Sequence, residues 1–164
     1  MGHTKTLKSL RLAGENKKAF YLIQHILIPE IIKKEPEVFI EIAYALSLKN
    51  QYSISWYYFK KYLENDSSYT LSELDFRYLS FLNVKLKADS DWCSFVKEQK
   101  LELNTVSPSQ PVSIVNLEFE FFHEVTYYFT VKCPHCGHEY TICTDATFLI
   151  DSEAPCPNCF NLTH

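Results

Sequence analysis

The chain has very few glycines, and this shortage excludes one large class of sites. Its 164 residues include only Gly2, Gly14 and Gly137. Phosphate-binding loops need several closely spaced glycines, because only glycine lets the backbone approach a phosphate group so closely. The sequence also shows no Ser/His/Asp arrangement and no His-Glu-x-x-His pattern. We therefore expect a non-catalytic protein.

Long hydrophobic runs are lacking as well. The best candidate, Ala19–Ile28, is shorter than a membrane span and contains Gln24 and His25. The basic N-terminal residues are not followed by the apolar run and small-residue cleavage site of a secretory signal. From the sequence we expect no membrane span and a cytoplasmic, reducing location.

Positive charge is scarce in the last third of the chain. Residues 107–164 carry a net charge of −6 with Lys132 as their one basic residue, whereas residues 1–35 carry +4. Proteins that bind DNA or RNA neutralise phosphates with Lys and Arg. Nucleic-acid binding is therefore disfavoured overall, and the basic N-terminal helices are the one place where it stays open as an alternative.

Two Cys-x-x-Cys pairs are the most informative feature that is present. They are Cys133-Pro-His-Cys136 and Cys156-Pro-Asn-Cys159, separated by 19 residues. This spacing is typical of a metal site, and four thiolates in a tetrahedron select zinc or, less often, a single iron. We expect one zinc ion there, with iron as the alternative, and two disulfides are disfavoured in a reducing compartment. Four thiolates leave no open coordination position, which indicates a structural and not a catalytic metal.

The residues near the two pairs support tight turns. Gly137 follows the first pair and suits a positive φ, whereas Phe160 holds the equivalent place after the second pair and predicts a less ideal turn. His135 and His138 are expected on the surface of the first turn and not as ligands. We expect the two remaining thiols, Cys93 and Cys143, to be small buried hydrophobic residues.

Alternating apolar and polar residues surround the first pair and predict β-strands. The alternation runs through residues 113–132, longer than one average strand, and resumes at Tyr140 and Ile142. Strand, cysteine turn, strand, loop and second cysteine turn resemble the zinc-ribbon and rubredoxin-like family over about residues 125–162. The resemblance implies a small antiparallel sheet clamped by a four-cysteine metal site, usually of structural zinc.

Upstream, the chain is predicted to be helical. Apolar residues recur at helical spacing, and the breaks between them divide residues 1–106 into six helices in pairs, with a repeat of about three dozen residues. The Pro- and Ser-rich stretch 107–111 is the expected linker to a β segment at 112–164. The predicted fold class is α+β, a helical repeat array followed by a small antiparallel zinc-binding sheet.

The segment from Pro36 to Ser68 resembles a tetratricopeptide repeat, and weaker likeness extends over about residues 5–100. The matching positions are Phe39, Ile42, Ala43 and Leu46 in its first helix and Tyr52, Phe59 and Leu63 in its second. The alternative is an ordinary six-helix bundle. By the resemblance, the residues facing a partner-binding groove would be Ile40, Tyr44, Leu48, Arg77 and Phe81, although the same side chains also suit a core.

These observations favour an adaptor or accessory subunit that binds a partner protein, such as a larger enzyme or complex. The helical repeats and the aromatic β segment would supply the contacts. The alternatives are an iron-containing electron-transfer module of rubredoxin type and nucleic-acid binding through the N-terminal helices. From the structural role of the metal we expect Cys136→Ser or Cys159→Ser to unfold residues 125–162 and to leave helical circular dichroism largely intact.

Overall fold

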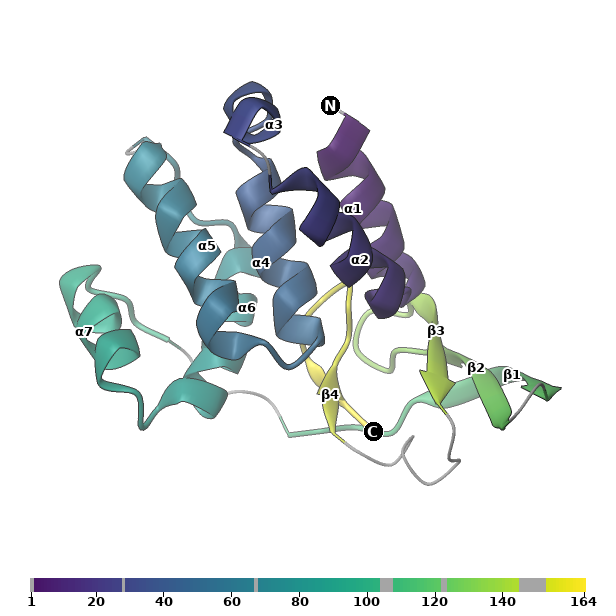
Figure 1. The fold of residues 1–164 in the computed structure, drawn as a ribbon. Coiled ribbons are helices and arrows are strands. Elements are labelled where there is room, and N and C mark those ends of the chain that lie inside the picture. The colour runs from purple at the N-terminus through teal and green to yellow at the C-terminus, as the bar shows by residue number, and fades with distance from the viewer. Residues whose placement is uncertain (1, 28, 67, 104–107, 122–123, 145–152) are drawn as a thin grey trace.

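The α+β fold is confirmed by a computed structural model, which describes residues 2–27, 29–66, 68–103, 108–121, 124–144 and 153–164. Seven helices within these residues precede two small antiparallel sheets that bear the cysteines (Figure 1). The helices are α1 Gly2–Ala13, α2 Asn16–Ile26, α3 Pro29–Lys34, α4 Val38–Leu48, α5 Tyr52–Asn65, α6 Glu73–Leu86 and α7 Ser90–Glu98. None of the described helices is long and apolar enough to cross a membrane.

The helix boundaries follow local capping signals. Ser72 accepts a hydrogen bond from the Asp75 amide while the Asp75 carboxylate accepts one from the Ser72 amide, a reciprocal capping box that starts α6. Asp89 accepts a hydrogen bond from the Trp92 amide and starts α7. The sequence analysis missed α3, because its six residues are too few to show a helical period.

Helix α4 is the centre of the helical half. It is buried almost all round, with α1 and α2 on one side and α5 and α6 on the other. A helix that is apolar on every face is typical of a protein core. The cluster against α1 and α2 includes Leu7, Ile23 and Ile42, and the cluster against α5, α6 and α7 includes Phe59 and Trp92.

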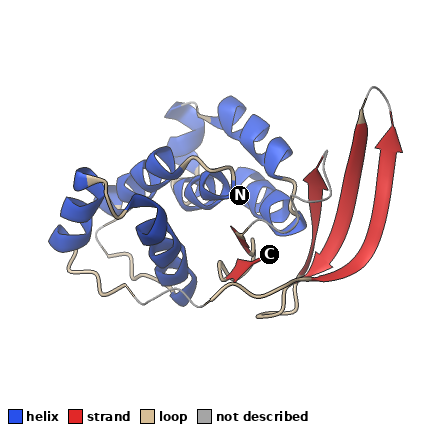
Figure 2. Ribbon diagram, turned by 90° about the horizontal axis from the view of Figure 1, so that it is seen from below, coloured by secondary structure: helices blue, strands red, loops and turns tan. Residues whose placement is uncertain are grey.

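The strands form two antiparallel sheets. The first has the order β1 Ser113–Phe121, β2 Val125–Lys132 and β3 Glu139–Thr144, and the second pairs β4 Ala154–Pro155 with β5 Leu162–Thr163. We call the hairpin of β1 and β2 the β arm, and Figure 2 shows that it projects well away from the helices. Gln110, in the predicted linker, forms a parallel bridge with Thr163, while Ser107 lies outside the described residues.

The turn between α1 and α2 packs directly against β3. Gly14 has φ +80°, and a Cβ atom added to it would lie 2.2 Å from the carbonyl oxygen of Thr141. Such a distance is far shorter than any real carbon–oxygen contact, so only glycine permits this close approach. The helical half and the half that carries the four paired cysteines therefore share a tight backbone contact.

Candidate metal centre

The four predicted cysteines come together at one point. The Sγ atoms of Cys133, Cys136, Cys156 and Cys159 all lie within 4.8 Å of one another. The Cys133–Cys159 pair is separated by 3.9 Å and the Cys136–Cys156 pair by 3.8 Å, Sγ to Sγ. Three of these cysteines are buried, and Cys136 is exposed.

The sulfur spacing fits a tetrahedral metal ion. Four sulfurs at about 2.3 Å from one zinc ion lie roughly 3.8 Å apart, whereas bonded sulfurs of a disulfide lie about 2.05 Å apart. The observed separations of 3.8 and 3.9 Å match the first geometry and not the second. The group can therefore hold one metal ion. When it is bound, a metal with four thiolate ligands crosslinks the two cysteine turns.

Each of the four sulfurs also accepts a hydrogen bond from nitrogen. The backbone amide of His135 donates to Cys133 Sγ, and that of Asn158 donates to Cys156 Sγ, both at 3.4 Å. The side-chain amides complete the set, from Asn158 to Cys136 Sγ at 3.5 Å and from Asn161 to Cys159 Sγ at 3.4 Å. Such bonds stabilise negative charge on sulfur, which is the form that binds a metal.

The sulfurs also influence one another's protonation. A hydrogen bond from the Cys156 thiol, aided by the amide groups of Asn161, lowers the pKa of the Cys159 thiol to about 4. The same hydrogen bond and burial raise the pKa of Cys156. One thiolate therefore forms readily even before a metal neutralises the cluster.

The two cysteine turns have the same backbone design. Gly137 N–H donates to the Cys133 carbonyl at 2.9 Å, and Phe160 N–H donates to the Cys156 carbonyl at 2.8 Å. Both residues adopt the left-handed conformation, with φ +77° at Gly137 and +59° at Phe160. The second turn thus has the same backbone hydrogen bond as the first, but a bulky residue in this conformation costs roughly 1–2 kcal/mol of backbone strain.

The ring of Phe160 explains why that strain is tolerated. Phe160 is 2 % exposed and belongs to the hydrophobic cluster of the helical half. Its ring centroid lies 5.4 Å from that of Tyr44 on α4, and 5.7 and 6.4 Å from those of Tyr78 and Phe81 on α6. Burial of an aromatic side chain stabilises a fold by more than the conformation costs.

Arg11 on α1 also contacts the second cysteine turn. Its guanidinium is buried, pairs with the Glu41 carboxylate on α4 at 3.1 Å, and donates to the Pro157 carbonyl between the two cysteines of the second pair. It also lies 5.0 Å above the centre of the Tyr44 ring. Arg11 therefore adds nothing to the basic surface that nucleic-acid binding would require.

Histidines connect the first turn to its surroundings. His138 Nε2 donates to the Leu12 carbonyl at the end of α1, and His135 Nε2 donates to the Leu162 carbonyl at 3.1 Å. Our expectation for Cys93 and Cys143 was wrong, because both thiols are exposed. Cys143 lies on β3, where successive side chains point to opposite faces. Tyr140 is buried on one face, and Cys143, an odd number of residues further along, lies on the other face and is exposed.

The predicted groove residues divide into two groups. Tyr44 and Phe81 are 3 and 2 % exposed and lie beneath Phe160, so the chain's own second turn covers them. Tyr44 also donates a hydrogen bond to the buried carboxylate of Asp75. Ile40, Leu48 and Arg77 are partly exposed and remain predicted partner contacts.

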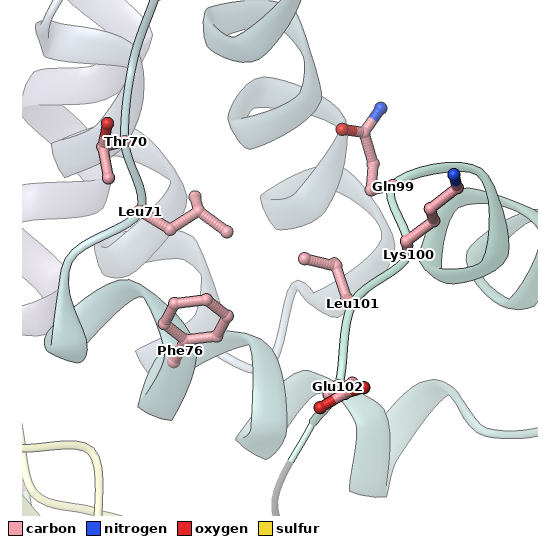
Figure 3. Close-up of a pocket in the computed structure, with 7 residues that line it drawn as sticks. All are labelled: Thr70, Leu71, Phe76, Gln99, Lys100, Leu101 and Glu102. Carbon is pink, nitrogen blue, oxygen red and sulfur yellow. The ribbon is translucent and has the colours of Figure 1, made fainter.

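A separate open depression of about 580 Å³ lies between the start of α6 and the segment after α7 (Figure 3). Apolar side chains of Leu71, Phe76 and Leu101 line it together with Lys100 and Glu102. None of its lining residues belongs to the cysteine cluster. The lining contains no His, Cys or Ser, and Thr70, Lys100 and Glu102 are its residues of the types that can act as nucleophile or general base.

Comparisons with protein-family models, with curated proteins and with solved structures gave no match to this chain. Its function must therefore be argued from the site and the surface alone.

Proposed function

We propose that this chain is a non-catalytic adaptor or accessory subunit that binds a partner protein. The single observation that carries the proposal is the exposure of β1, all nine residues of which are solvent-accessible. Phe119 and Phe121 are 68 and 72 % exposed on the projecting β arm. Large apolar patches rimmed by polar residues mark interaction sites on soluble proteins.

In this proposal the four cysteines hold one structural zinc ion. The hydrogen bonds to every sulfur and the sulfur spacing support a bound metal, and four ligands leave no position for substrate. The zinc-ribbon likeness is supported by the β2–turn–β3 hairpin that carries the first cysteine pair. The metal would fix the base from which the β arm projects.

The helical half would act as a repeat-like scaffold. The antiparallel pairing of α4 with α5 supports a tetratricopeptide-like unit, with Ile40, Leu48 and Arg77 as its accessible groove residues. Because Phe160 covers Tyr44 and Phe81, two of the five predicted groove residues, the β arm would take the larger share of the partner contact.

Site-specific crosslinking tests the proposal. A photoreactive amino acid placed at Phe119 should give one discrete crosslinked product in the cells that make the protein. The matched control is the same substitution at Tyr21 on α2, which is 65 % exposed but lies away from the β arm. The absence of a product at position 119, or equal products at both positions, would contradict the adaptor function.

An iron-containing electron carrier is the second candidate, and the exposed Cys136 favours it, because an exposed ligand shortens the path for electrons. Metal analysis separates the two functions. A ferric thiolate site absorbs visible light, whereas a zinc site is colourless. We expect a colourless protein with one zinc ion per chain.

A further inference from the structure

The outer edge of β1 is an unpaired sheet edge. The sheet order β1-β2-β3 leaves one side of β1 without a pairing strand among the described residues. Proteins normally guard such edges with short strands, charged side chains, proline or a β-bulge. Ser113–Phe121 is nine residues long and has no lysine, arginine or proline. Its bulge lies at its beginning, between Ile114 and Asn116, so the rest of the edge is guarded only by the charges of Glu118 and Glu120.

The side chains of β1 separate into an apolar and an acidic face. Leu117, Phe119 and Phe121 lie opposite Phe129, Tyr127 and Val125 of β2, so these six side chains share one face of the β arm. Near the base of the arm the β2 side of this face is covered, with Phe129 only 4 % exposed, whereas Leu117 opposite it is 47 % exposed. Towards the tip it is bare, because Phe119 and Phe121 are 68 and 72 % exposed.

The opposite face carries Glu118 and Glu120, and both are exposed. Glu120 accepts a hydrogen bond from Tyr128, and Glu118 accepts one from Asn116. Among the described residues neither glutamate forms an ion pair with Lys or Arg. A strand added to this edge therefore meets an apolar row on one face and unpaired negative charge on the other.

These two faces decide which kind of strand fits. Cross-strand neighbours in a sheet share a face, and opposite charges placed directly across from each other stabilise the pair, whereas like charges destabilise it. A second copy of β1 paired to this edge would place its own Glu118 and Glu120 close to those already there. It would supply no positive charge to balance them. A segment that alternates apolar residues with Lys or Arg would satisfy both rows.

We infer that β1 binds an extended, basic and apolar segment of the partner protein, which adds to the sheet as a fourth strand. Main-chain hydrogen bonds would supply affinity, and the alternation of side chains would supply selectivity. This inference rests on the proposed adaptor function and names the chemistry of its partner.

Synthetic peptides test the inference with the intact chain. The probe is a fluorescent peptide that alternates valine and lysine, and two controls replace its lysines by glutamate or interrupt it with proline. The proline peptide keeps most of the charge but cannot complete a ladder. We expect saturable binding of the Val/Lys peptide, binding about tenfold weaker with proline, and none with glutamate.

Variants of the chain locate the site. The double substitution Glu118→Gln/Glu120→Gln should weaken binding of the Val/Lys peptide about tenfold and reduce its dependence on salt. The matched control is Glu37→Gln/Glu64→Gln, which removes two exposed acidic groups from the helical half and should leave the affinity unchanged. Circular dichroism of both variants verifies that the fold is retained.

Three results would overturn the inference. One is equal binding of the Val/Lys and proline-interrupted peptides, which would show charge attraction without strand addition. Another is no peptide binding at all. The third is a dimer of the protein that Phe119→Ser converts to a monomer, which would show that a second copy covers β1. If the residue at position 119 still crosslinks to a different protein in these cases, the adaptor function stands and only the partner chemistry is wrong; a crosslink to a second copy of this chain contradicts both.

Discussion

Gly137 and Phe160 hold equivalent places in the two cysteine turns, and both have positive φ, +77° and +59°. The first position is filled by the residue that favours this conformation, and the second by an aromatic residue that does not. The difference lies in what surrounds them, because a Cβ atom added to Gly137 would meet only the end of the Lys132 side chain, at 3.8 Å, whereas the ring of Phe160 is buried against α4 and α6. The second turn therefore carries two of the four clustered cysteines and, through Phe160, is also part of the hydrophobic core of the helical half.

Substitution of Phe160 should be among the most destabilising single changes. Phe160→Ala removes a buried ring and should cost about 3–5 kcal/mol in free energy of unfolding. Phe160→Gly loses the same ring but relieves the left-handed strain, so it should be about 1 kcal/mol more stable than the alanine variant. Chemical denaturation measures both.

The control for Phe160 is Phe121→Ala on the exposed β arm, which should change stability by less than about 0.5 kcal/mol. A stability of Phe160→Ala close to that of the wild type would show that the ring does not hold the two halves together.

Replacing one partner of the buried ion pair between Arg11 and Glu41 should lower the free energy of unfolding strongly. Arg11→Met leaves the Glu41 carboxylate buried without its cation and should cost about 3–5 kcal/mol. The double variant Arg11→Met/Glu41→Leu should recover part of this loss, since no buried charge remains. The control is Arg77→Met, whose partner Glu73 is exposed, and it should cost only a few tenths of a kcal/mol.

Substitution of Gly14 should destabilise the fold for two reasons, a steric clash and an unfavourable backbone conformation. Gly14→Ala places a methyl group on the Thr141 carbonyl and forces a non-glycine residue to φ +80°. We expect a loss of at least about 2 kcal/mol in thermal or chemical unfolding, because backbone and not a flexible side chain must move. Gly2→Ala is the control, since nothing lies within 4 Å of the added methyl group.

Removal of the metal should destabilise both halves together. In Cys159→Ser we expect helical circular dichroism and the fluorescence of Trp56 and Trp92 to be lost in a single transition at lower temperature than in the wild type. Cys93→Ser changes an exposed thiol outside the cluster and should unfold like the wild type. An unchanged helical transition in Cys159→Ser would instead show that the halves are independent.

Stability at high pH should depend on Tyr78. Burial raises the pKa of its hydroxyl well above the usual value near 10, so the folded chain keeps a proton that the unfolded chain releases. The contribution of the Tyr78 hydroxyl to the free energy of unfolding is therefore complete below pH 10. Above pH 10 this contribution falls by about 1.4 kcal/mol per pH unit. Unfolding free energies of Tyr78→Phe should fall less steeply above pH 10, whereas Tyr21→Phe, at an exposed position, should match the wild type.

The sequence was sufficient to predict the features that local rules determine. The four clustered cysteines follow from Cys-x-x-Cys spacing, and the strand of residues 113–121 follows from its alternation. Each of these patterns lies within one continuous stretch of sequence, so a single sequence is enough to predict it.

What the sequence could not predict depends on contacts between distant segments. Arg11 looked like one more surface cation, and Phe160 looked like an imperfection in a cysteine turn. Their roles arise only where α1, α4, α6 and the second turn meet. The expectation that loss of a cysteine ligand leaves the helices intact came from the metal site alone and stays a prediction. The packing of Phe160 and Arg11 across the two halves, which the sequence does not show, favours the opposite outcome.

The contact between Arg11 and Pro157 joins residues 146 positions apart. During synthesis, α1, α4 and α6 leave the ribosome long before the turn that completes their core. Until residue 160 has emerged, the Tyr44, Tyr78 and Phe81 side chains lack their covering ring, and the nascent helical half exposes an aromatic surface. Non-local closure of this kind slows folding and lengthens the time in which a nascent chain can aggregate or meet a chaperone. If the four cysteines hold zinc as proposed, zinc supply at the moment of translation becomes a determinant of how much of this protein reaches its native state.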